Sequence, residues 1–303
     1  MNLFIFFFIF IFILCSPPSA HSQGIMMKDG KHVVAKSLKR QGDNIMATDP
    51  AENGGIAMHG DVGYPLAQVE KLEFPEPAQI KSTPDLIVSG KAAEGLAQLD
   101  AALRYYDSFR DAPGSYWGEL TLLKCNALLS LGRVAEVDAL AQQLSRATTD
   151  PELALGARAM SAAVLTNKGE YARAIEIFDG VLKDAIRGDT PAIASIYKGR
   201  SHLALKQWEP ALLSFLMVPV FYPEARALMP PSLLGAGRAY FQLDDFEHAK
   251  TTLNDLIKAY ANTPEAAEAK TELEKIIRKE KALEGPGEPV KAPANPNPPA
   301  KSS

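Results

Sequence analysis

The chain has 303 residues, of which 47% are hydrophobic and 22% are charged, and its formal net charge is −4. This length is sufficient for one large domain or two smaller ones. After residue 14 no long apolar run follows, so we do not expect the rest of the chain to insert directly into a membrane.

The first segment has the pattern of an export signal. Residues 3–14 are purely apolar and too short to span a bilayer, which takes about 20 residues in a helix. Small and polar residues follow, and cleavage after Ala20 or after Ser22 satisfies the small-residue pattern of signal peptidase. The sequence therefore predicts a signal peptide over 1–22 and an exported protein, periplasmic or associated with the cell envelope.

The two cysteines predict neither a lipid anchor nor a disulfide bond. Cys15 lies inside the predicted signal and follows Leu14, whereas a lipidated cysteine normally follows a small residue, so a lipoprotein is not expected. Removal of the signal leaves Cys125 as the only thiol, which excludes an intramolecular disulfide. Cys125 is expected to pack in a helical core.

Residues 24–74 predict a small all-β module. The Asp29-Gly30 pair favours a tight hairpin turn, and Asn53-Gly54-Gly55 marks a second turn. Five short strands are expected, at 25–28, 31–38, 44–48, 55–59 and 69–74. Met27 to Gly30, Tyr64 to Leu66 and Val69 to Phe74 together resemble the SH3-like or Sm-like modules of exported bacterial proteins.

Charges in this module are balanced, with lysines and an arginine offset by aspartates and glutamates. Nucleic acid is attracted by a basic field, so no nucleic-acid partner is expected.

Residues 75–84 contain three prolines and predict a short, stiff linker. A helical face over 91–106 follows, and 85–111 is interpreted as half of a repeat.

The remaining helical region, about 120–284, repeats itself. The small residues Val137, Ala174, Ala211 and Ala249 are 37, 37 and 38 residues apart. Apolar residues recur three before, four after and seven after each of them, which is one face of a helix. A preceding helix carries another small residue in each copy, namely Cys125, Ala162, Gly199 or Gly237. Each copy is therefore a helix hairpin that buries its apolar face against its neighbours.

Gly237, Tyr240, Phe246 and Ala249, and likewise Tyr171, Ala174 and Phe178, resemble the tetratricopeptide repeat (TPR). The period exceeds the family's length of about 34 residues, and we attribute the excess to longer connections at 146–151, 185–191 and 219–231. The resemblance implies a mainly α fold, a TPR-like α-solenoid of stacked hairpins over 85–284, preceded by the small β module.

The helix from Thr263 to about Leu283 is expected to cap the array, with Leu273 and Ile277 on its inner side and a polar outer face. Residues 285–303 are rich in Pro, Ala, Lys and Asn and predict a disordered tail.

No pattern predicts chemistry. The five histidines form no His-x-x-x-His pair, and phosphate-loop and nucleophile-elbow motifs are absent. We therefore expect no enzyme, no catalytic residues, no metal site and no cofactor.

Binding is the expected function, because in TPR-like arrays the first helix of each hairpin lines a concave groove. The resemblance assigns seven residues to that groove: Asn126, Asn167, Arg200, Leu203, Arg238, Phe241 and Gln242. Two arginines above an apolar floor suit a carboxylate next to an apolar side chain, as in a peptide or a chain terminus. The alternative is that both arginines pair with acids of neighbouring repeats.

The sequence thus favours an exported scaffold that holds proteins or peptides of the bacterial cell envelope, similar to repeat-containing proteins that assist envelope machines. One alternative is a periplasmic binder of glycans or small ligands whose β module reads the ligand, with Tyr64 and Phe74 as the available aromatic residues. Another is an accessory subunit of an envelope enzyme or transport complex.

Overall fold

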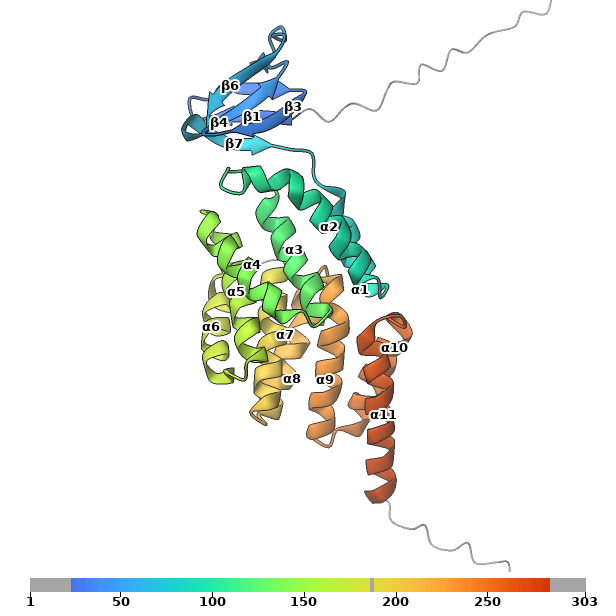
Figure 1. Cartoon of the computed structure of the whole chain (residues 1–303). Helices are drawn as coiled ribbons and strands as arrows, with labels where there is room; N and C mark the ends of the chain where they lie inside the picture. The colour runs from blue at the N-terminus through green and yellow to red at the C-terminus, as the bar shows by residue number, and fades with distance from the viewer. Residues whose placement is uncertain (1–22, 186–187, 284–303) are drawn as a thin grey trace, which may run out of the picture. The chain divides into compact units, whose positions relative to one another are not determined.

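The computed structural model describes residues 23–185 and 188–283 (Figure 1). The predicted signal peptide and C-terminal tail lie outside these ranges. Contacts between backbone segments divide the described chain into two compact units. The first unit contains the residues up to Thr83 and Ala93–Ala157, and the second contains Pro84–Ala92 and the residues from Arg158 onward.

The N-terminal part of the first unit is a small antiparallel β module. Its strands are β1 (Gln23–Met27), β2 (His32–Ala35), β3 (Ser37–Gln41), β4 (Asn44–Thr48), β5 (Ala51–Glu52), β6 (Asp61–Pro65) and β7 (Val69–Glu73). They form one sheet in the order β5-β2-β1-β7 and another in the order β3-β4-β6. Buried and exposed residues alternate along β2 and β4, which places Val33 and Ile45 in the core.

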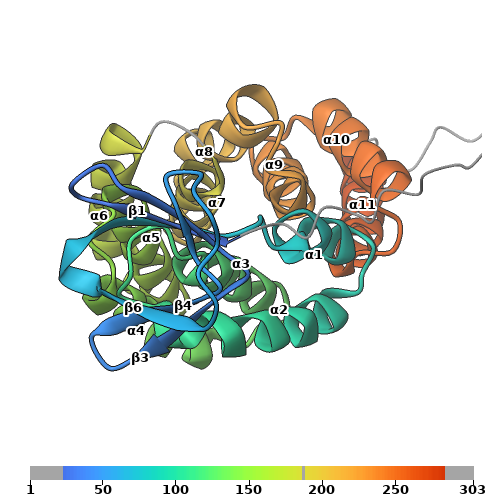
Figure 2. The ribbon, with the colours of Figure 1, turned by 90° about the horizontal axis from the view of Figure 1, so that it is seen from above.

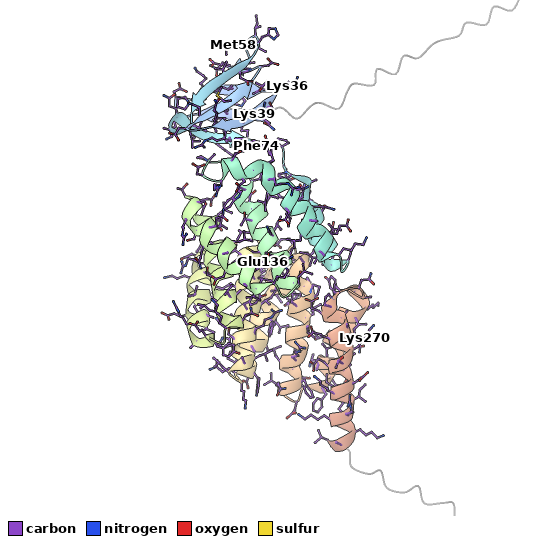
Figure 3. The ribbon with its side chains drawn as sticks, viewed as in Figure 1. Lys36, Lys39, Met58, Phe74, Glu136 and Lys270 are labelled. Atoms are coloured by element: carbon purple, nitrogen blue, oxygen red, sulfur yellow. The ribbon has the colours of Figure 1, made fainter. Side chains whose placement is uncertain are left out.

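Two strand predictions are wrong in detail. The strand expected over 31–38 breaks at Lys36, and its halves β2 and β3 pair in different sheets. The segment 55–59, where a strand is expected, is a loop, and the chain turns at both of its ends, where Asn53, Gly54 and Gly60 have positive φ angles. Met58 lies in this loop, and the next strand is β6 (Figure 3).

The β module is packed against helices of its own unit. Phe74, which follows β7, has its ring centroid 5.3 Å from that of Tyr106 and 5.2 Å from that of Phe109 (Figure 3). The backbone amide of Leu72 donates to the carbonyl of Pro113 at 2.7 Å. The module and the end of α2 therefore share a core within the first unit.

The helices of the first unit are α2 (Ala92–Tyr106), α3 (Trp117–Ser130) and α4 (Val134–Ala147), with a 3₁₀ turn, η2 (Asp107–Phe109), after α2. Helices α1 (Ala78–Val88) and α5 (Pro151–Asn167) each have residues in both units. Helix α1 occupies the second half of the segment predicted to be a linker, and Pro84 lies inside it. Proline is disfavoured inside a helix because it has no amide hydrogen to donate to the carbonyl four residues earlier, so the sequence alone favours a linker here.

The second unit is a series of helix hairpins. Its further helices are α6 (Tyr171–Asp184), α7 (Asp189–Ala204), α8 (Trp208–Phe221), α9 (Met229–Gln242), α10 (Phe246–Ala259) and α11 (Pro264–Leu283), with η3 (Arg226–Leu228) before α9. Each helix packs on the next one along the chain, and α9 also packs on α7 and α11 (Figure 2). The predicted TPR-like arrangement of hairpins after a small sheet is confirmed.

The long connection expected at 219–231 is largely helical. Helix α8 continues through Pro219 to Phe221, and α9 begins at Met229. Pro219 lacks the amide hydrogen that would bond the carbonyl of Phe215, and the Ser232 hydroxyl donates to that carbonyl instead. A side chain of the next helix thus satisfies the backbone group that the proline leaves open.

In α11 the residue on the inner side differs from the prediction. Ile276 is fully buried and Ile277 is 56% exposed, while Leu273 packs partly buried on the core. Within the described ranges, no helix combines the length and the apolar character needed to cross a membrane.

Candidate functional site

Helices α7 and α9 carry five of the predicted groove residues at equivalent places in their hairpins. Arg200 and Leu203 lie on α7, and Arg238, Phe241 and Gln242 lie on α9. These five residues are called the α7–α9 face below. Because α7 packs on α9 and α9 packs on α11, all three helices contribute to the surroundings of this face.

The packing of α8 between these two helices fixes their separation. The Phe215 ring of α8 lies between Gly199 of α7 and Gly235 of α9. A Cβ atom at Gly199 would approach the ring to 2.9 Å, and one at Gly235 would approach it to 2.3 Å. Glycine is therefore required on both helices for this close approach, as the small-residue pattern predicted for Gly199.

Arg238 is already held by acids of the neighbouring helix. Its Nε donates to Glu272 Oε1 at 3.0 Å, and its Nη2 donates to Glu268 Oε2 at 2.7 Å. The Glu272 side chain is only 13% exposed, so this pair is partly shielded from water. Arg238 therefore follows the alternative given in the sequence analysis, since it pairs with acids of the next repeat.

Arg200 has a different environment. It is exposed, and its guanidinium carbon lies 4.6 Å from the centroid of the Tyr197 ring. No ion pair joins Arg200 to a carboxylate among the residues that the structure describes. Burial raises the pKa of Glu265, and the nearby charge of Arg200 opposes this shift.

Phe241 contributes an aromatic ring to the α7–α9 face, and a cation from α11 lies over that ring. Lys279 Nζ lies 5.0 Å from the Phe241 ring centroid and 5.3 Å from that of Phe246. The same ammonium donates to Asp244 Oδ1 at 2.5 Å. The ammonium is attracted by the faces of both rings, and the Phe241 side chain is half-buried.

Two predicted groove residues do not contribute an open polar group. Asn126, on α3 of the other unit, is only 7% exposed. Asn167 is at the end of α5, where its amide donates to the carbonyl of Ala163 at 2.8 Å. Both side chains are better explained as parts of their own helices.

Sequence reasoning missed the contribution of α11. Glu265, Glu268 and Glu272 are three and four residues apart, which places them on one side of that helix. This spacing was available as a signal, but α11 was interpreted only as a polar cap.

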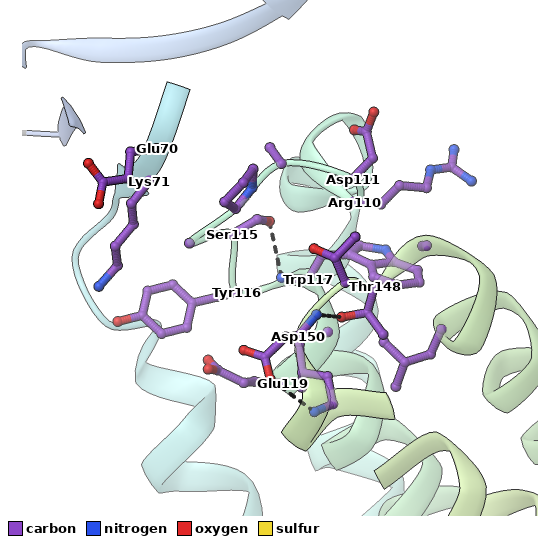
Figure 4. Close-up of a pocket in the computed structure, with 18 residues that line it drawn as sticks. Glu70, Lys71, Arg110, Asp111, Ser115, Tyr116, Trp117, Glu119, Thr148 and Asp150 are labelled. Atoms are coloured by element: carbon purple, nitrogen blue, oxygen red, sulfur yellow. Dashed lines mark hydrogen bonds between the residues drawn. The ribbon is translucent and has the colours of Figure 1, made fainter. Parts of the chain in front are cut away.

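A separate cavity of about 520 Å³ lies in the first unit (Figure 4). Residues of β7, of the α2–α3 connection and of the α4–α5 connection line it, among them Lys71, Tyr116, Trp117, Glu119 and Asp150. Burial raises the pKa of Glu119, with further contributions from Asp150 and Glu76, while Lys71 opposes the shift. Segments from three places in the sequence form the cavity, so no local pattern predicts it.

The aromatic residues expected to let the β module read a ligand are buried. Tyr64 is 5% exposed and donates its hydroxyl to Glu52, and Phe74 is 8% exposed. Neither side chain offers a stacking surface to a sugar. Among residues 23–185 and 188–283, no cluster of three or more His, Cys, Asp or Glu side chains is arranged to hold a metal ion.

Comparisons with known proteins agree with the repeat assignment. Residues 232–263, which span most of α9 and all of α10, match the family described as tetratricopeptide repeat. No curated protein matches the chain.

Three solved structures are similar at low identity. MamA, residues 41 to end, from Desulfovibrio magneticus RS-1 is 16% identical, covers 61% of this chain and 97% of its own, and has a TM-score of 0.34. A tetratricopeptide repeat protein from Parabacteroides merdae ATCC 43184 is 16% identical, covers 68% and 75%, and has a TM-score of 0.37. The MamA RS-1 ArsTM double mutant is 16% identical, covers 69% and 99%, and has a TM-score of 0.32.

Proposed function

We propose that this protein is a non-catalytic scaffold that holds other proteins or peptides through the α7–α9 face. The observation that carries the proposal is the contrast between its two arginines. Arg238 is neutralised by two carboxylates of α11, whereas Arg200 is exposed and lacks such a partner in the described chain. Arg200 thus has hydrogen-bond donors available for a partner's carboxylate.

The partner chemistry follows from what surrounds Arg200. The guanidinium is stacked on Tyr197, and Leu203 and Phe241 provide apolar surface on the same face. A carboxylate beside an apolar side chain, at a peptide chain end or on an extended segment, matches this combination. Of the residues that the sequence assigned to the groove, we therefore keep Arg200, Leu203, Phe241 and Gln242 in the proposed binding site. We assign Arg238 the separate role of positioning α11.

The site of action that we propose is the bacterial cell envelope. The support is the export-signal pattern of residues 1–22, with cleavage near Ala20 or Ser22, and it comes from the sequence alone. A cleaved leader would leave a chain whose described helices are too short or too polar to span a membrane.

Affinity capture tests the scaffold function. Partners recovered from envelope extracts with the wild-type protein are identified, and their affinities are then measured with purified proteins. We expect Arg200→Ala to weaken binding by about 10- to 100-fold, because it removes a hydrogen bond between charged groups. Arg173→Ala is the matched control, since Arg173 is an exposed arginine of α6 that pairs, within the described part of the chain, with Glu170 of its own turn alone. Equal binding by the wild type and Arg200→Ala would contradict the assignment of the face.

A second candidate function is an accessory subunit that binds a glycan or another small polar ligand. The cavity beside Glu119 and Tyr116 favours it, because it is large enough for a sugar and carries several hydrogen-bonding groups. Trp117 lines this cavity, so ligand titrations followed by Trp117 fluorescence in a Trp208→Phe background test the idea. Saturable quenching that Glu119→Gln and Tyr116→Phe abolish would support it, and unchanged fluorescence across a set of glycans would contradict it.

A further inference from the structure

A short segment around the end of α1 belongs to the second unit, although the residues on both sides of it belong to the first. It comprises Pro84–Ala92, which is the end of α1 and its connection to α2. This segment is called the strap below. The chain therefore enters the second unit at Pro84 and leaves it again after Ala92, far ahead of the helix hairpins that form the rest of that unit.

One end of the strap is joined by an ion pair to the segment before α9. Asp85 Oδ1 lies 2.5 Å from Nη2 of Arg226, which is in η3. The 3₁₀ turn η3 packs on both α7 and α9. The two side chains are 55% and 58% exposed, and an ion pair as exposed as this stabilises a structure little. Its contribution is mainly to fix where the strap lies.

The other end of the strap makes a close backbone contact before α11. Gly90 has a φ angle of 74°, and a Cβ atom at this position would lie 2.1 Å from the carbonyl oxygen of Asn262. Asn262 is in the connection between α10 and α11. Glycine alone allows both the positive φ angle and this approach. The strap therefore runs from the segment before α9 to the connection before α11.

Apolar residues lie between these two contacts. Ile87 is 8% exposed, and Leu86 and Val88 are half-buried. Burial of an isoleucine side chain stabilises more than an exposed ion pair does. Ile87 thus contributes more than Asp85 to holding the strap. What the second unit receives is an acidic residue followed by apolar residues at the end of a helix.

The strap has the chemistry that we propose for a partner of the scaffold. In both cases a carboxylate pairs with an arginine, and apolar side chains stand next to the carboxylate. For the strap the carboxylate belongs to Asp85 of the same chain, and the arginine is Arg226 rather than Arg200.

The backbone is interrupted near both ends of the strap. Pro84 lies inside α1 and has no amide hydrogen to donate to the carbonyl of Ile80, so the helix is weakened where the strap begins. At the other end α1 stops at Val88, and the chain turns at Gly90. The strap can therefore leave the second unit without breaking the middle of a regular helix.

We propose that the strap is an internal ligand of the second unit, and that a helical segment of another protein replaces it. That segment carries an acidic residue followed by apolar residues, and it binds Arg226 and the connection before α11. The proposal rests on the scaffold function only in that an outside protein supplies the segment. A tethered segment has a high effective concentration, so the strap occupies this site until such a partner competes with it.

Limited proteolysis measures release of the strap in the full-length protein. The amide of Lys91 donates to the carbonyl of Leu86 at 2.7 Å, which fixes the turn around the bond that trypsin would cut after Lys91. Trypsin needs a locally unfolded substrate, so cleavage there reports the released strap. We expect Ile87→Ser to accelerate this cleavage at least tenfold. Ile277→Ser is the matched control, because Ile277 is 56% exposed, and it should leave the rate unchanged.

A charge exchange tests the ion pair. Asp85→Lys should accelerate cleavage after Lys91 about three- to tenfold, since it sets two positive charges against each other. Combining it with Arg226→Asp should restore resistance. The matched control is Asp179→Lys, since Asp179 is 56% exposed and pairs with Lys198 of the next helix at 2.6 Å. This control should be cut after Lys91 at the wild-type rate.

A peptide tests whether the vacated site accepts a segment from outside. The probe has the sequence of residues 78–92 and is added up to about 1 mM to the full-length Ile87→Ser protein. The amide resonances of Arg226 and Asn262 should move toward their wild-type positions. A peptide that itself carries Asp85→Lys should bind at least threefold more weakly, and the wild-type protein should bind neither peptide.

Two results would overturn the proposal. One is that the peptide leaves both resonances unchanged, because the strap is then a permanent part of the second unit. The other is that Ile87→Ser accelerates cleavage throughout the second unit as much as after Lys91, because the strap is then needed for folding. Neither experiment uses an outside protein or Arg200, so a failure of the α7–α9 face in affinity capture is a separate result.

Discussion

Phe215 shows how single residues determine the spacing of helices in the second unit. Its ring fills the space between two backbones, and glycine stands on both sides because any Cβ atom would overlap the ring. Gly199 was expected to be small from its place in the repeat. Gly235 was not, because it lies two residues before the corresponding position of α9, which Gly237 occupies.

We expect Gly235→Ala to lower the free energy of unfolding by about 1–3 kcal/mol, because overpacking forces a backbone shift. Urea denaturation followed by circular dichroism measures the change. Gly180→Ala is the control, since its Cβ would meet only the flexible end of Arg158 at 3.1 Å. Removing a helical glycine there should leave stability unchanged or raise it by about 0.5–1 kcal/mol. Equal effects of the two substitutions would refute the packing account.

Cys125 is a second residue whose surroundings determine its chemistry. The side chain is fully buried, and burial raises the pKa of its thiol to about 12. Since the thiolate is the reactive form, iodoacetamide should not label Cys125 in the native protein at pH 8, and unfolding in urea should make it reactive. The measurement uses Cys15→Ser protein and mass spectrometry. Rapid labelling under native conditions would contradict the position assigned to this residue.

At the scale of elements, α11 is attached to α9 by charged side chains as well as by its apolar face. Ala269 and Ile276 are buried in the core cluster that α9 and α10 share with α11. Arg238 adds two hydrogen bonds to the acids of α11, one of them largely shielded from solvent. A double substitution of Arg200 and Arg238 would therefore change partner binding and helix docking together.

We expect Arg238→Ala to destabilise the docking of α11 by about 1 kcal/mol and to accelerate hydrogen exchange in Pro264–Leu283. Lys275→Ala is the control, because Lys275 also contacts Glu272 but is itself 52% exposed. Exchange of α11 should be unchanged in that control and in Arg200→Ala. If Arg200→Ala accelerated exchange as much as Arg238→Ala, the separate roles of the two arginines would be disproved.

The turns between paired helices show what the period predicts and what it does not. Gly132, Gly169, Lys206 and Asp244 recur at the repeat spacing, and all four have positive φ angles between 58° and 85°. Glycine adopts this conformation without strain, so the first two turns were recognisable from sequence. Lys206 and Asp244 adopt the same conformation without being glycine, and the amides of Gln207 and Asp245 after them donate to the carbonyls of His202 and Tyr240.

At the scale of the whole molecule, the β module belongs to the same compact unit as α2 to α4. Gly114, in the connection between α2 and α3, has a φ angle of 79°, and a Cβ there would lie 2.2 Å from the carbonyl oxygen of Leu72 in β7. We expect Gly114→Ala to destabilise the module and the adjoining helices together, by about 1–3 kcal/mol.

Two signals measured on the same urea titration test this coupling. Trp117 fluorescence in a Trp208→Phe background reports on α3, and amide resonances of β1 and β2 report on the sheet. Both transitions should shift by the same amount in Gly114→Ala. Gly132→Ala, a glycine with positive φ whose Cβ would meet no atom within 4 Å, controls for backbone strain alone. A shift of the sheet without a shift of Trp117 would contradict the shared core.

The sequence predicted the helix hairpins because the repeat compares the chain with itself, and each buried face recurs at the same offsets. It predicted poorly where long-range contacts override local preference. The helical course of Pro219, for example, depends on the Ser232 hydroxyl, which lies in the next helix and donates to the carbonyl of Phe215. At the candidate site, the period located Arg200 and Arg238 but could not show that only Arg238 has carboxylate partners.

Site-specific crosslinking in living cells is the most direct test of the central claim that the α7–α9 face holds other proteins. A photoreactive residue is introduced at Leu203 or Gln242 on that face, and at Lys258 on α10 as the control. We predict that both face positions crosslink to a common set of envelope proteins, that Arg200→Glu abolishes these adducts, and that Lys258 yields none of them. Absence of protein adducts from the face, or the same adducts at Lys258 irrespective of Arg200, would contradict the account.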